Sequence, residues 1–380
     1  MAATRAEVER GLESLLLRER DAGLFTHAYV AAGLLADDAP RFRAALAADG
    51  RDVFDLASLT KAVATVPLVF AAVQRGEANL DGTVGAWLGT ERAASLGLAP
   101  ELQRLSVRSV LRHETGLPAW RNFWVCHLGV DLDADLVDRA GRWQRLVEGL
   151  NRAAVASATQ TQGLGAPRQV YSDLGFLLLG LLLEATSDRD VGALFADFCA
   201  KELGLAALPL GYGPVLAARE KTFAAKAVPT AVCPVRRRLL VGDVHDENCA
   251  SLGGLAGHAG LFGTGDALAT FLVALAKSTV GRSLLSANAS ARPATSPADP
   301  SQDSLCGWRL GNGPSTAPFC GGRAMGHPGF TGTAFWVCPE TQAYAIFLTN
   351  RVASGRTSSL AAIAAARRDV FSLLAAALST

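Results

Sequence analysis

Short segments in which apolar and polar residues alternate, rich in β-branched and aromatic side chains, lie near both ends of the chain. They cover residues 26–35, 41–47, 305–311, 332–338 and 343–349. This pattern is typical of half-buried strands. We therefore expect the two ends of the chain to build one antiparallel sheet together.

In the middle of the chain, apolar residues recur mostly at helical spacing. The predicted helices cover residues 58–75, 106–113, 136–153, 172–185 and 191–203. Strands at both ends with helices between them indicate an α+β chain, in which an all-helical lobe is inserted into a central antiparallel sheet.

Both termini carry further helical patterns. Residues 1–21 combine leucines with many charged side chains, as in an amphipathic surface helix, and residues 358–378 are rich in alanine. We expect these helices to flank the sheet. The predicted domains are an α/β lobe formed by residues 1–57 and 241–380 and a mainly helical lobe formed by residues 58–240, with an active site between them.

Charge and hydropathy limit the partners of the chain. Its 380 residues include 36 basic and 35 acidic ones, so the net charge of +1 offers no field to attract nucleic acid. The longest apolar run, residues 174–183, is shorter than the about 20 residues that a membrane-spanning helix needs. Residues 1–21 do not resemble a secretory signal. We expect a small-molecule partner and a cytoplasmic location, or a periplasmic one if the chain is truncated, and leave the oligomeric state open.

The cysteines and histidines do not suggest a metal site. Seven cysteines occur without a Cys-x-x-Cys pair, which predicts buried free thiols. His245, Asp246, Glu247 and His258 lack the spacing of a zinc-hydrolase helix and are expected to form structural hydrogen bonds. The glycine-rich residues 253–260 lack the ending of a phosphate-binding loop and are interpreted as a tight loop beside the site. We expect neither a metal nor a cofactor.

The first candidate for chemistry is Ser58-Leu59-Thr60-Lys61. It opens a predicted helix, where side chains at positions i and i+3 lie on one face. A serine hydroxyl needs a neighbouring base, and a lysine with a lowered pKa can serve. Ser-x-x-Lys alone is a weak signal. Pro67 inside the same helix predicts either a bend or a different boundary, because an interior proline disrupts helical hydrogen bonding.

Further segments follow Ser58-x-x-Lys61 in a fixed order. With Tyr171-Ser172-Asp173 and His327-Pro328-Gly329, it resembles the three motifs of the serine β-lactamase and penicillin-binding protein superfamily, in particular class C-like enzymes of its esterase and D-peptidase branch. The resemblance covers about residues 26–351. It includes four further segments, at residues 111–118, 244–248, 257–262 and 348–351.

The resemblance implies a β-lactamase/transpeptidase-like fold and a role for each motif. Ser58 would attack the substrate carbonyl, Lys61 and Tyr171 would handle its proton, and an acyl-enzyme would form and be hydrolysed. The backbone N–H groups of Ser58 and Phe330 would form the oxyanion hole. Asp173, His327 and Gly329 would belong to the same substrate-binding region.

Two positions depart from the β-lactamase pattern. Asp173 stands where asparagine is common, and its charge would favour the ammonium form of Lys61, leaving Tyr171 as the better base. His327 and Pro328 replace the lysine and hydroxyl residue that often bind an anionic β-lactam. Both departures favour a broader hydrolase over a β-lactamase.

The sequence predicts a serine hydrolase acting on small esters or amides. A D-alanyl carboxypeptidase or D-aminopeptidase, and then a class C-type β-lactamase, are the alternatives within this chemistry. A catalytically silent ligand sensor on the same fold is the alternative of another class. An α/β-hydrolase is disfavoured because no Gly-x-Ser-x-Gly occurs.

Overall fold

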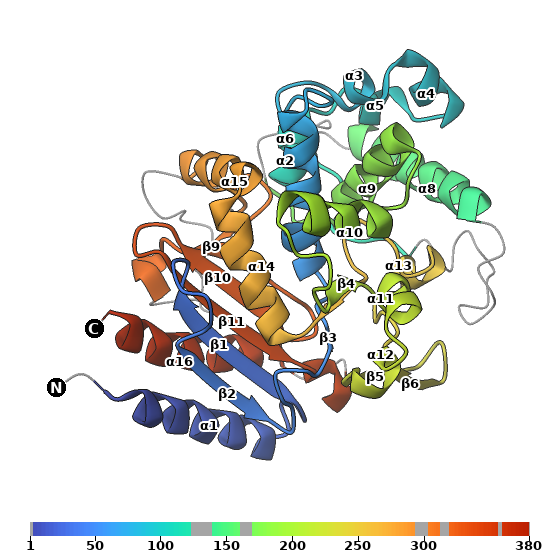
Figure 1. Cartoon of the computed structure of the whole chain (residues 1–380). Helices are drawn as coiled ribbons and strands as arrows, with labels where there is room; N and C mark the ends of the chain where they lie inside the picture. Colours follow the sequence, from blue (N-terminus) through green and yellow to red (C-terminus); the bar gives the residue numbers. More distant parts are fainter. Residues whose placement is uncertain are drawn as a thin grey trace.

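The alternating segments at the two ends of the chain form one six-stranded antiparallel sheet. The computed structural model describes residues 3–122, 139–159, 169–292, 303–311, 319–355 and 359–379. The order of the strands in the sheet is β2 (Phe42–Leu46), β1 (Ala28–Leu34), β11 (Ala343–Thr349), β10 (Ala334–Cys338), β9 (Met325–Pro328) and β8 (Arg309–Leu310). The N-terminal strands thus pair with the C-terminal ones in the middle of the sheet, as expected (Figure 1).

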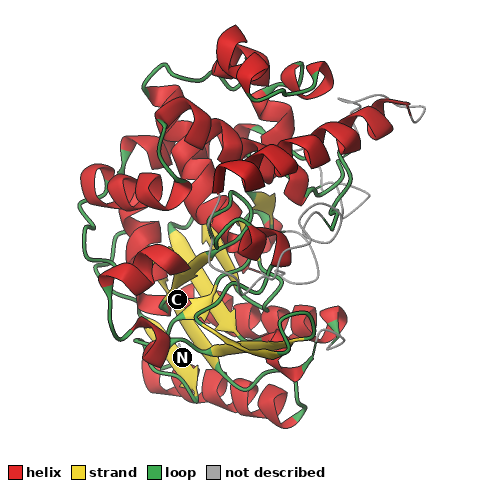
Figure 2. Ribbon diagram, turned by 90° about the vertical axis from the view of Figure 1, so that its right-hand side faces the viewer, coloured by secondary structure: helices red, strands yellow, loops and turns green. Residues whose placement is uncertain are grey.

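Both faces of this sheet are covered. Alternate residues of β11 point to opposite sides, since Ile346 belongs to one hydrophobic core and Phe347 to the other. The core around Phe347 is closed by α1 (Arg5–Asp21) and α16 (Leu360–Leu378), which contact each other across the termini. The opposite face packs against α14 (Gly265–Lys277) (Figure 1). Helices therefore lie on both sides of the sheet (Figure 2). The expected terminal helices therefore flank the sheet on one side.

A mainly helical part is inserted between β2 and the late strands (Figure 1). Its helices are η1 (Lys61–Thr65), α2 (Val66–Gln74), α3 (Val84–Leu88), α4 (Thr90–Ser95), α5 (Pro100–Gln103), α6 (Val107–Leu111), α8 (Arg139–Thr159), α9 (Asp173–Ser187), α10 (Val191–Glu202), α11 (Gly213–Arg219), α12 (Phe223–Lys226) and α13 (Glu247–Ser251). The first residues of the predicted helix 136–153 lie outside the described residues.

Short strands and helices complete the fold. β3 (Phe54–Asp55), β7 (Leu261–Gly263) and β4 (Leu210–Tyr212) form a small sheet in the order β3-β7-β4, and β5 (Pro229–Cys233) pairs with β6 (Arg238–Val241). The remaining helices are α15 (Thr279–Ser290), η2 (Phe319–Gly322) and η3 (Arg351–Ser354). The α+β class is confirmed, but the insertion, expected to be all-helical, also carries β4 and the β5–β6 hairpin. The domain boundaries stay a prediction.

Pro67 fits its helix because the backbone changes its hydrogen bonding there. Residues Lys61–Thr65 form a π-helix, and α2 starts at Val66, so Pro67 stands in the first turn of an α-helix. A missing N–H is tolerated at that position. Single π turns are frequent at functional sites, and this one contains Lys61.

No single helix of the described residues is both long and apolar enough to span a membrane, although α14 and α15, bent by 85°, pass the same test of length and composition as a pair.

The expectation of free thiols is wrong for two of the seven cysteines. Cys320 in η2 and Cys338 at the end of β10 form a disulfide across 18 positions of the sequence. Four other cysteines are buried and free, as expected: Cys199, Cys233, Cys249 and Cys306. Cys126 lies outside the described residues. The spacing of Cys320 and Cys338 matches no motif, and only the pairing of β10 with β9 brings them together.

We expect the Cys320→Ser/Cys338→Ser double variant to be less stable than the wild type by about 3 kcal/mol, because the disulfide closes a loop of 18 residues in the unfolded chain. Urea unfolding without reductant measures this difference. Reductant should remove it, and an equal difference in reduced and oxidised protein would contradict the prediction.

Candidate active site

Ser58 lies in a turn directly after β3, one residue before the helix that carries Lys61. Ala57, which precedes it, has a positive φ of 48°, an unfavourable conformation for a residue with a side chain. The buried carboxyl of Asp55 supports this turn, because its Oδ1 accepts from the Ala57 N–H at 2.8 Å and its Oδ2 from the His245 N–H at 2.8 Å. Burial raises the pKa of Asp55 to about 6.

Lys61 is completely buried and its ammonium faces Ser58. Nζ lies 2.9 Å from the Ser58 Oγ, 2.7 Å from the Asp173 Oδ1 and 3.3 Å from the carbonyl oxygen of His258. Burial by itself lowers the pKa of Lys61. The charge of Asp173 and the contact of Lys61 with Tyr171 outweigh burial, so the pKa of Lys61 lies above its ordinary value. The resting lysine is therefore an ammonium, as the presence of Asp173 led us to expect.

Tyr171 lies between several cationic and aromatic groups. Its ring centroid is 5.0 Å from the Lys61 Nζ and 5.4 Å from the Arg309 Cζ. The rings of His113 and His327 lie 4.7 Å and 5.9 Å from it. An ammonium on Lys61 cannot accept the Ser58 proton, so this arrangement favours Tyr171 as the base.

His113 and His327 are both buried and neutral. Burial, together with the charges of Lys61 and Arg309, lowers the pKa of each imidazole well below its ordinary value. His113 accepts the Ser172 N–H at Nδ1, 3.0 Å away, so its proton is on Nε2. His327 Nδ1 lies 2.7 Å from the Pro328 carbonyl oxygen, which can only accept, so its proton is on Nδ1.

The residues after His327 form a turn that is tied to the segment before Ser58. Thr331 Oγ1 donates to the Asp55 carbonyl oxygen at 2.9 Å, and Thr333 Oγ1 donates to the Leu56 carbonyl oxygen at 3.2 Å. Within the described residues, the N–H groups of Ser58 and Phe330 have no hydrogen-bond partner. These are the two donors that the resemblance assigns to the oxyanion hole.

Ser58, Tyr171 and Asp173 open into one cavity of about 620 Å³. Its wall combines charges of both signs, because Asp246, Glu247, Arg309 and Arg367 line it along with apolar groups such as Trp120 and Phe330. A cavity of this size suits a small molecule.

Asp246 and His258, on the wall of this cavity, are joined by a hydrogen bond of 2.8 Å between Asp246 Oδ1 and His258 Nε2. The same oxygen accepts the Cys249 N–H and caps α13, which confirms the expected structural hydrogen bonding for Asp246 and His258. The glycine-rich loop borders the site as expected, since His258 and Ala259 line the cavity.

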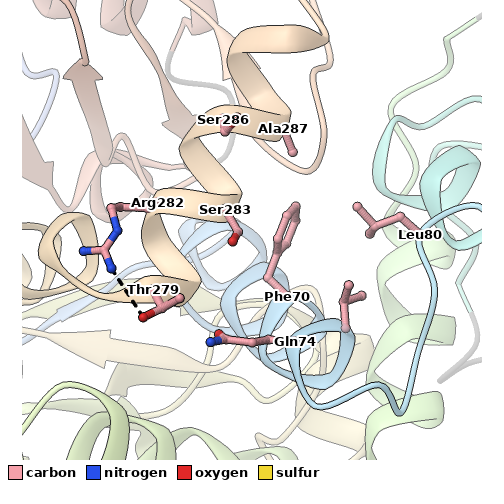
Figure 3. Close-up of a pocket in the computed structure, with 9 residues that line it drawn as sticks. Phe70, Gln74, Leu80, Thr279, Arg282, Ser283, Ser286 and Ala287 are labelled. Atoms are coloured by element: carbon pink, nitrogen blue, oxygen red, sulfur yellow. Dashed lines mark hydrogen bonds between the residues drawn. The ribbon is translucent and has the colours of Figure 1, made fainter.

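A second cavity, of about 580 Å³, lies between α2 and α15. Figure 3 shows Phe70 and Gln74 on one side and Thr279, Arg282 and Ser283 on the other. Arg282 donates to the Thr279 Oγ1 at 3.4 Å. Among the described residues that line it, no serine or threonine has a histidine, lysine or carboxylate beside it, so the cavity at Ser58 is the candidate active site.

The structure brings together most of the residues that the sequence nominated. Lys61 lies against Ser58, Asp173 and Tyr171, and Gly329 and Phe330 line the same cavity as these three residues. His327 is buried against Tyr171 and is not among the residues that line the cavity. Direct contact of His327 with substrate stays a prediction.

Sequence reasoning did not single out Asp55, Arg309 or Arg367. None of the three belongs to a motif. A lone aspartate two residues before the turn of a nucleophile is the only signal that could have pointed to Asp55, whereas Arg309 and Arg367 come from distant segments.

Comparison with known proteins gives one family. A family model described as Beta-lactamase matches residues 27–368. A Bacillus subtilis (strain 168) protein named N-acetylmuramyl-L-alanine amidase is 28% identical over 318 residues, which cover 79% of this chain and 68% of the relative. An Escherichia coli (strain K12) protein named putative D-alanyl-D-alanine carboxypeptidase is 24% identical over 313 residues, covering 79% and 69%.

Solved structures agree on the fold. EstCE1, described as a hydrolase with promiscuous acyltransferase activity, aligns with a TM-score of 0.65 at 15% identity and covers 97% of this chain and 99% of its own. D-amino acid amidase from Ochrobactrum anthropi SV3 aligns with a TM-score of 0.64 at 16% identity, covering 97% and 98%. At such low identities these structures establish the fold, and the predicted resemblance is confirmed.

Replacing Asp55 by asparagine should damage the turn at Ser58. An amide has one acceptor oxygen, so its NH₂ would face either the Ala57 or the His245 N–H. We expect a loss of about 1–3 kcal/mol in stability and a fall in kcat. Thermal unfolding and ester hydrolysis measure both, with exposed Asp49→Asn as the control; equal behaviour of the two variants would contradict the assignment.

Replacing Asp173 by asparagine should lower the pKa of Lys61, because Asp173 holds that pKa up. The ammonium is then lost at lower pH, and we expect the pH profile of acylation to move to lower pH. Exposed Asp188→Asn serves as control. An unchanged profile in Asp173→Asn would show that Lys61 does not titrate in the reaction.

Proposed function

This chain belongs to the beta-lactamase family, and we propose that it is a serine hydrolase that acts on small esters or amides through an acyl-enzyme on Ser58. The observation that carries the proposal is the 2.9 Å contact between Ser58 Oγ and Lys61 Nζ at the wall of a cavity. Nucleophile and proton-handling groups within hydrogen-bond reach are what covalent catalysis requires.

Acylation follows from this geometry. Tyr171 reacts in its phenolate form: it accepts the Ser58 proton and becomes the neutral phenol while Oγ attacks the substrate carbonyl carbon. The oxygen of the tetrahedral intermediate accepts hydrogen bonds from the N–H groups of Ser58 and Phe330. The ammonium of Lys61 lies beside the proton path and stabilises the negative charge that develops there. The same proton returns to the leaving alcohol or amine.

Deacylation repeats these steps with water. Water attacks the acyl carbonyl, gives its proton to Tyr171, and the proton passes to Ser58 Oγ when the ester bond breaks.

Esters and amides come first because attack of Ser58 on the carbonyl carbon serves both substrate classes. The name of the Bacillus subtilis relative, N-acetylmuramyl-L-alanine amidase, supports amides. A D-alanyl carboxypeptidase or D-aminopeptidase is the second candidate, since the Escherichia coli relative carries such a name. A β-lactamase ranks third because His327 is buried and Pro328 has no hydroxyl for an anionic substrate.

A cytoplasmic location remains the proposal that the charged N-terminal helix supports. The Cys320–Cys338 disulfide argues in the other direction, because disulfides are typical of oxidising compartments. Fractionation of cells that produce the full-length protein distinguishes the two.

A fluorophosphonate probe tests the central proposal. We expect one adduct per chain, located on Ser58 by peptide mass spectrometry, and loss of p-nitrophenyl ester hydrolysis by about 10⁴-fold or more in Ser58→Ala. Hydrolysis of a D-alanyl peptide and of a chromogenic cephalosporin should be measured beside that of the p-nitrophenyl ester.

Two results would refute the proposal. Ester turnover that survives in Ser58→Ala would assign the activity to another residue. No adduct on Ser58 and no turnover of any substrate would favour a catalytically silent ligand sensor. Ser251→Ala, which changes a buried serine of α13 outside the cavity lining, is the control.

A further inference from the structure

Two buried arginines hold the turn that contains Phe330. Arg351 donates to the Phe330 carbonyl oxygen from Nε at 3.1 Å and from Nη2 at 2.6 Å. Arg367 donates from Nη2 to the carbonyl oxygens of Gly329 and Thr333, both at 2.8 Å, and from Nε to that of Gly332 at 3.1 Å. Four carbonyl groups of one five-residue turn thus face guanidinium groups.

The bond to the Gly329 carbonyl bears on catalysis through the geometry of the peptide. The carbonyl of Gly329 and the N–H of Phe330 belong to one planar trans peptide, in which they point in opposite directions. A guanidinium on the carbonyl side therefore fixes the plane and directs the N–H away from the arginine. A hydrogen bond on the carbonyl oxygen also polarises the peptide and strengthens the N–H as a donor.

The charge of Arg367 is not neutralised nearby. Its side chain extends from α16 and lines the cavity that contains Ser58. Burial and the charges of Arg351 and Arg309 lower its pKa, and no carboxylate of the described residues counters that effect. Three carbonyl oxygens of the turn compensate the buried guanidinium by hydrogen bonds, but no negative charge in the described part of the chain pairs with it. Its charge is therefore left to act on a negative charge that forms at the oxyanion hole during the reaction.

Resting on the proposed function, we infer that Arg367 is a positioning residue for the oxyanion hole: through the Gly329 carbonyl it orients the Phe330 N–H, and its charge stabilises the tetrahedral intermediate. Arg351 supports the same turn from the Phe330 carbonyl. The effect is specific to the transition state, because a ground-state carbonyl carries little charge.

The test compares Arg367→Met and Arg367→Lys with the same changes at Arg368, an exposed neighbour on the same helix. The rate of labelling of Ser58 by a fluorophosphonate is measured by mass spectrometry, and kcat and KM are measured with p-nitrophenyl acetate. We expect Arg367→Met to lower kcat and the labelling rate by about 100-fold while KM changes less than about threefold. Arg367→Lys keeps the positive charge but loses the planar set of N–H donors of the guanidinium, and it should recover about tenfold of that loss.

The outcomes separate the two proposals. Wild-type protein that is not labelled at Ser58 refutes the proposed function and this inference with it. Labelled wild type together with a folded Arg367→Met variant of unchanged kcat overturns the inference alone. A rise in KM that matches the loss of kcat/KM, or an Arg367→Lys variant as slow as Arg367→Met, would assign Arg367 a structural role. If Arg367→Met does not fold, a folded Arg367→Lys variant with wild-type kcat overturns the inference.

Discussion

The buried ammonium of Lys61 is the constraint on which the rest of the site depends. A cation without solvent exposure costs several kcal/mol unless charge and hydrogen bonds compensate it. The compensation comes from Ser58 in the turn just before the helix of Lys61, from Asp173 at the start of α9 and from the carbonyl of His258 in the glycine-rich loop. Three segments far apart in the sequence must therefore meet within hydrogen-bond distance of one nitrogen atom.

This meeting point explains why glycine occurs where it does. Gly257 packs so closely on α9 that a Cβ atom there would collide with the carbonyl oxygen of Phe176. Its own carbonyl accepts the Thr65 hydroxyl at 2.6 Å, one helical turn after Lys61. The loop thus fits between two helices only because it lacks side chains at this point. The packing of the helical insertion and the hydrogen bonding of the buried Lys61 ammonium therefore depend on the same glycine-rich loop.

A second set of contacts fixes the nucleophile relative to the oxyanion turn. Asp55 holds the strained turn before Ser58, and the hydroxyls of Thr331 and Thr333 bind the carbonyls of that same segment. The nucleophile and the Phe330 N–H are thereby positioned by one network that connects β3 with the end of β9. Preorganised donors of this kind avoid reorganisation when the oxyanion forms.

Local pattern determined a good part of this protein. The strand-like segments rich in β-branched and aromatic residues predicted β1, β2, β10 and β11, and helical periodicity predicted α1, α9, α10 and α16. The motifs around Ser58, Tyr171 and His327 indicated the nucleophile, its neighbours and the family. These features depend on neighbours along the chain, which a sequence records directly.

Only the tertiary structure decided the remainder. β9 is short and contains a proline, so no periodicity marks it, and the Cys320–Cys338 disulfide depends on its pairing with β10. The protonation of Lys61 depends on how close Asp173 lies, and the buried position of His327 differs from what its motif suggested. Asp55 and Arg367 gain their importance from backbone groups of distant segments. Contacts to main-chain atoms leave no signature in side-chain order, and the folded structure is where they become visible.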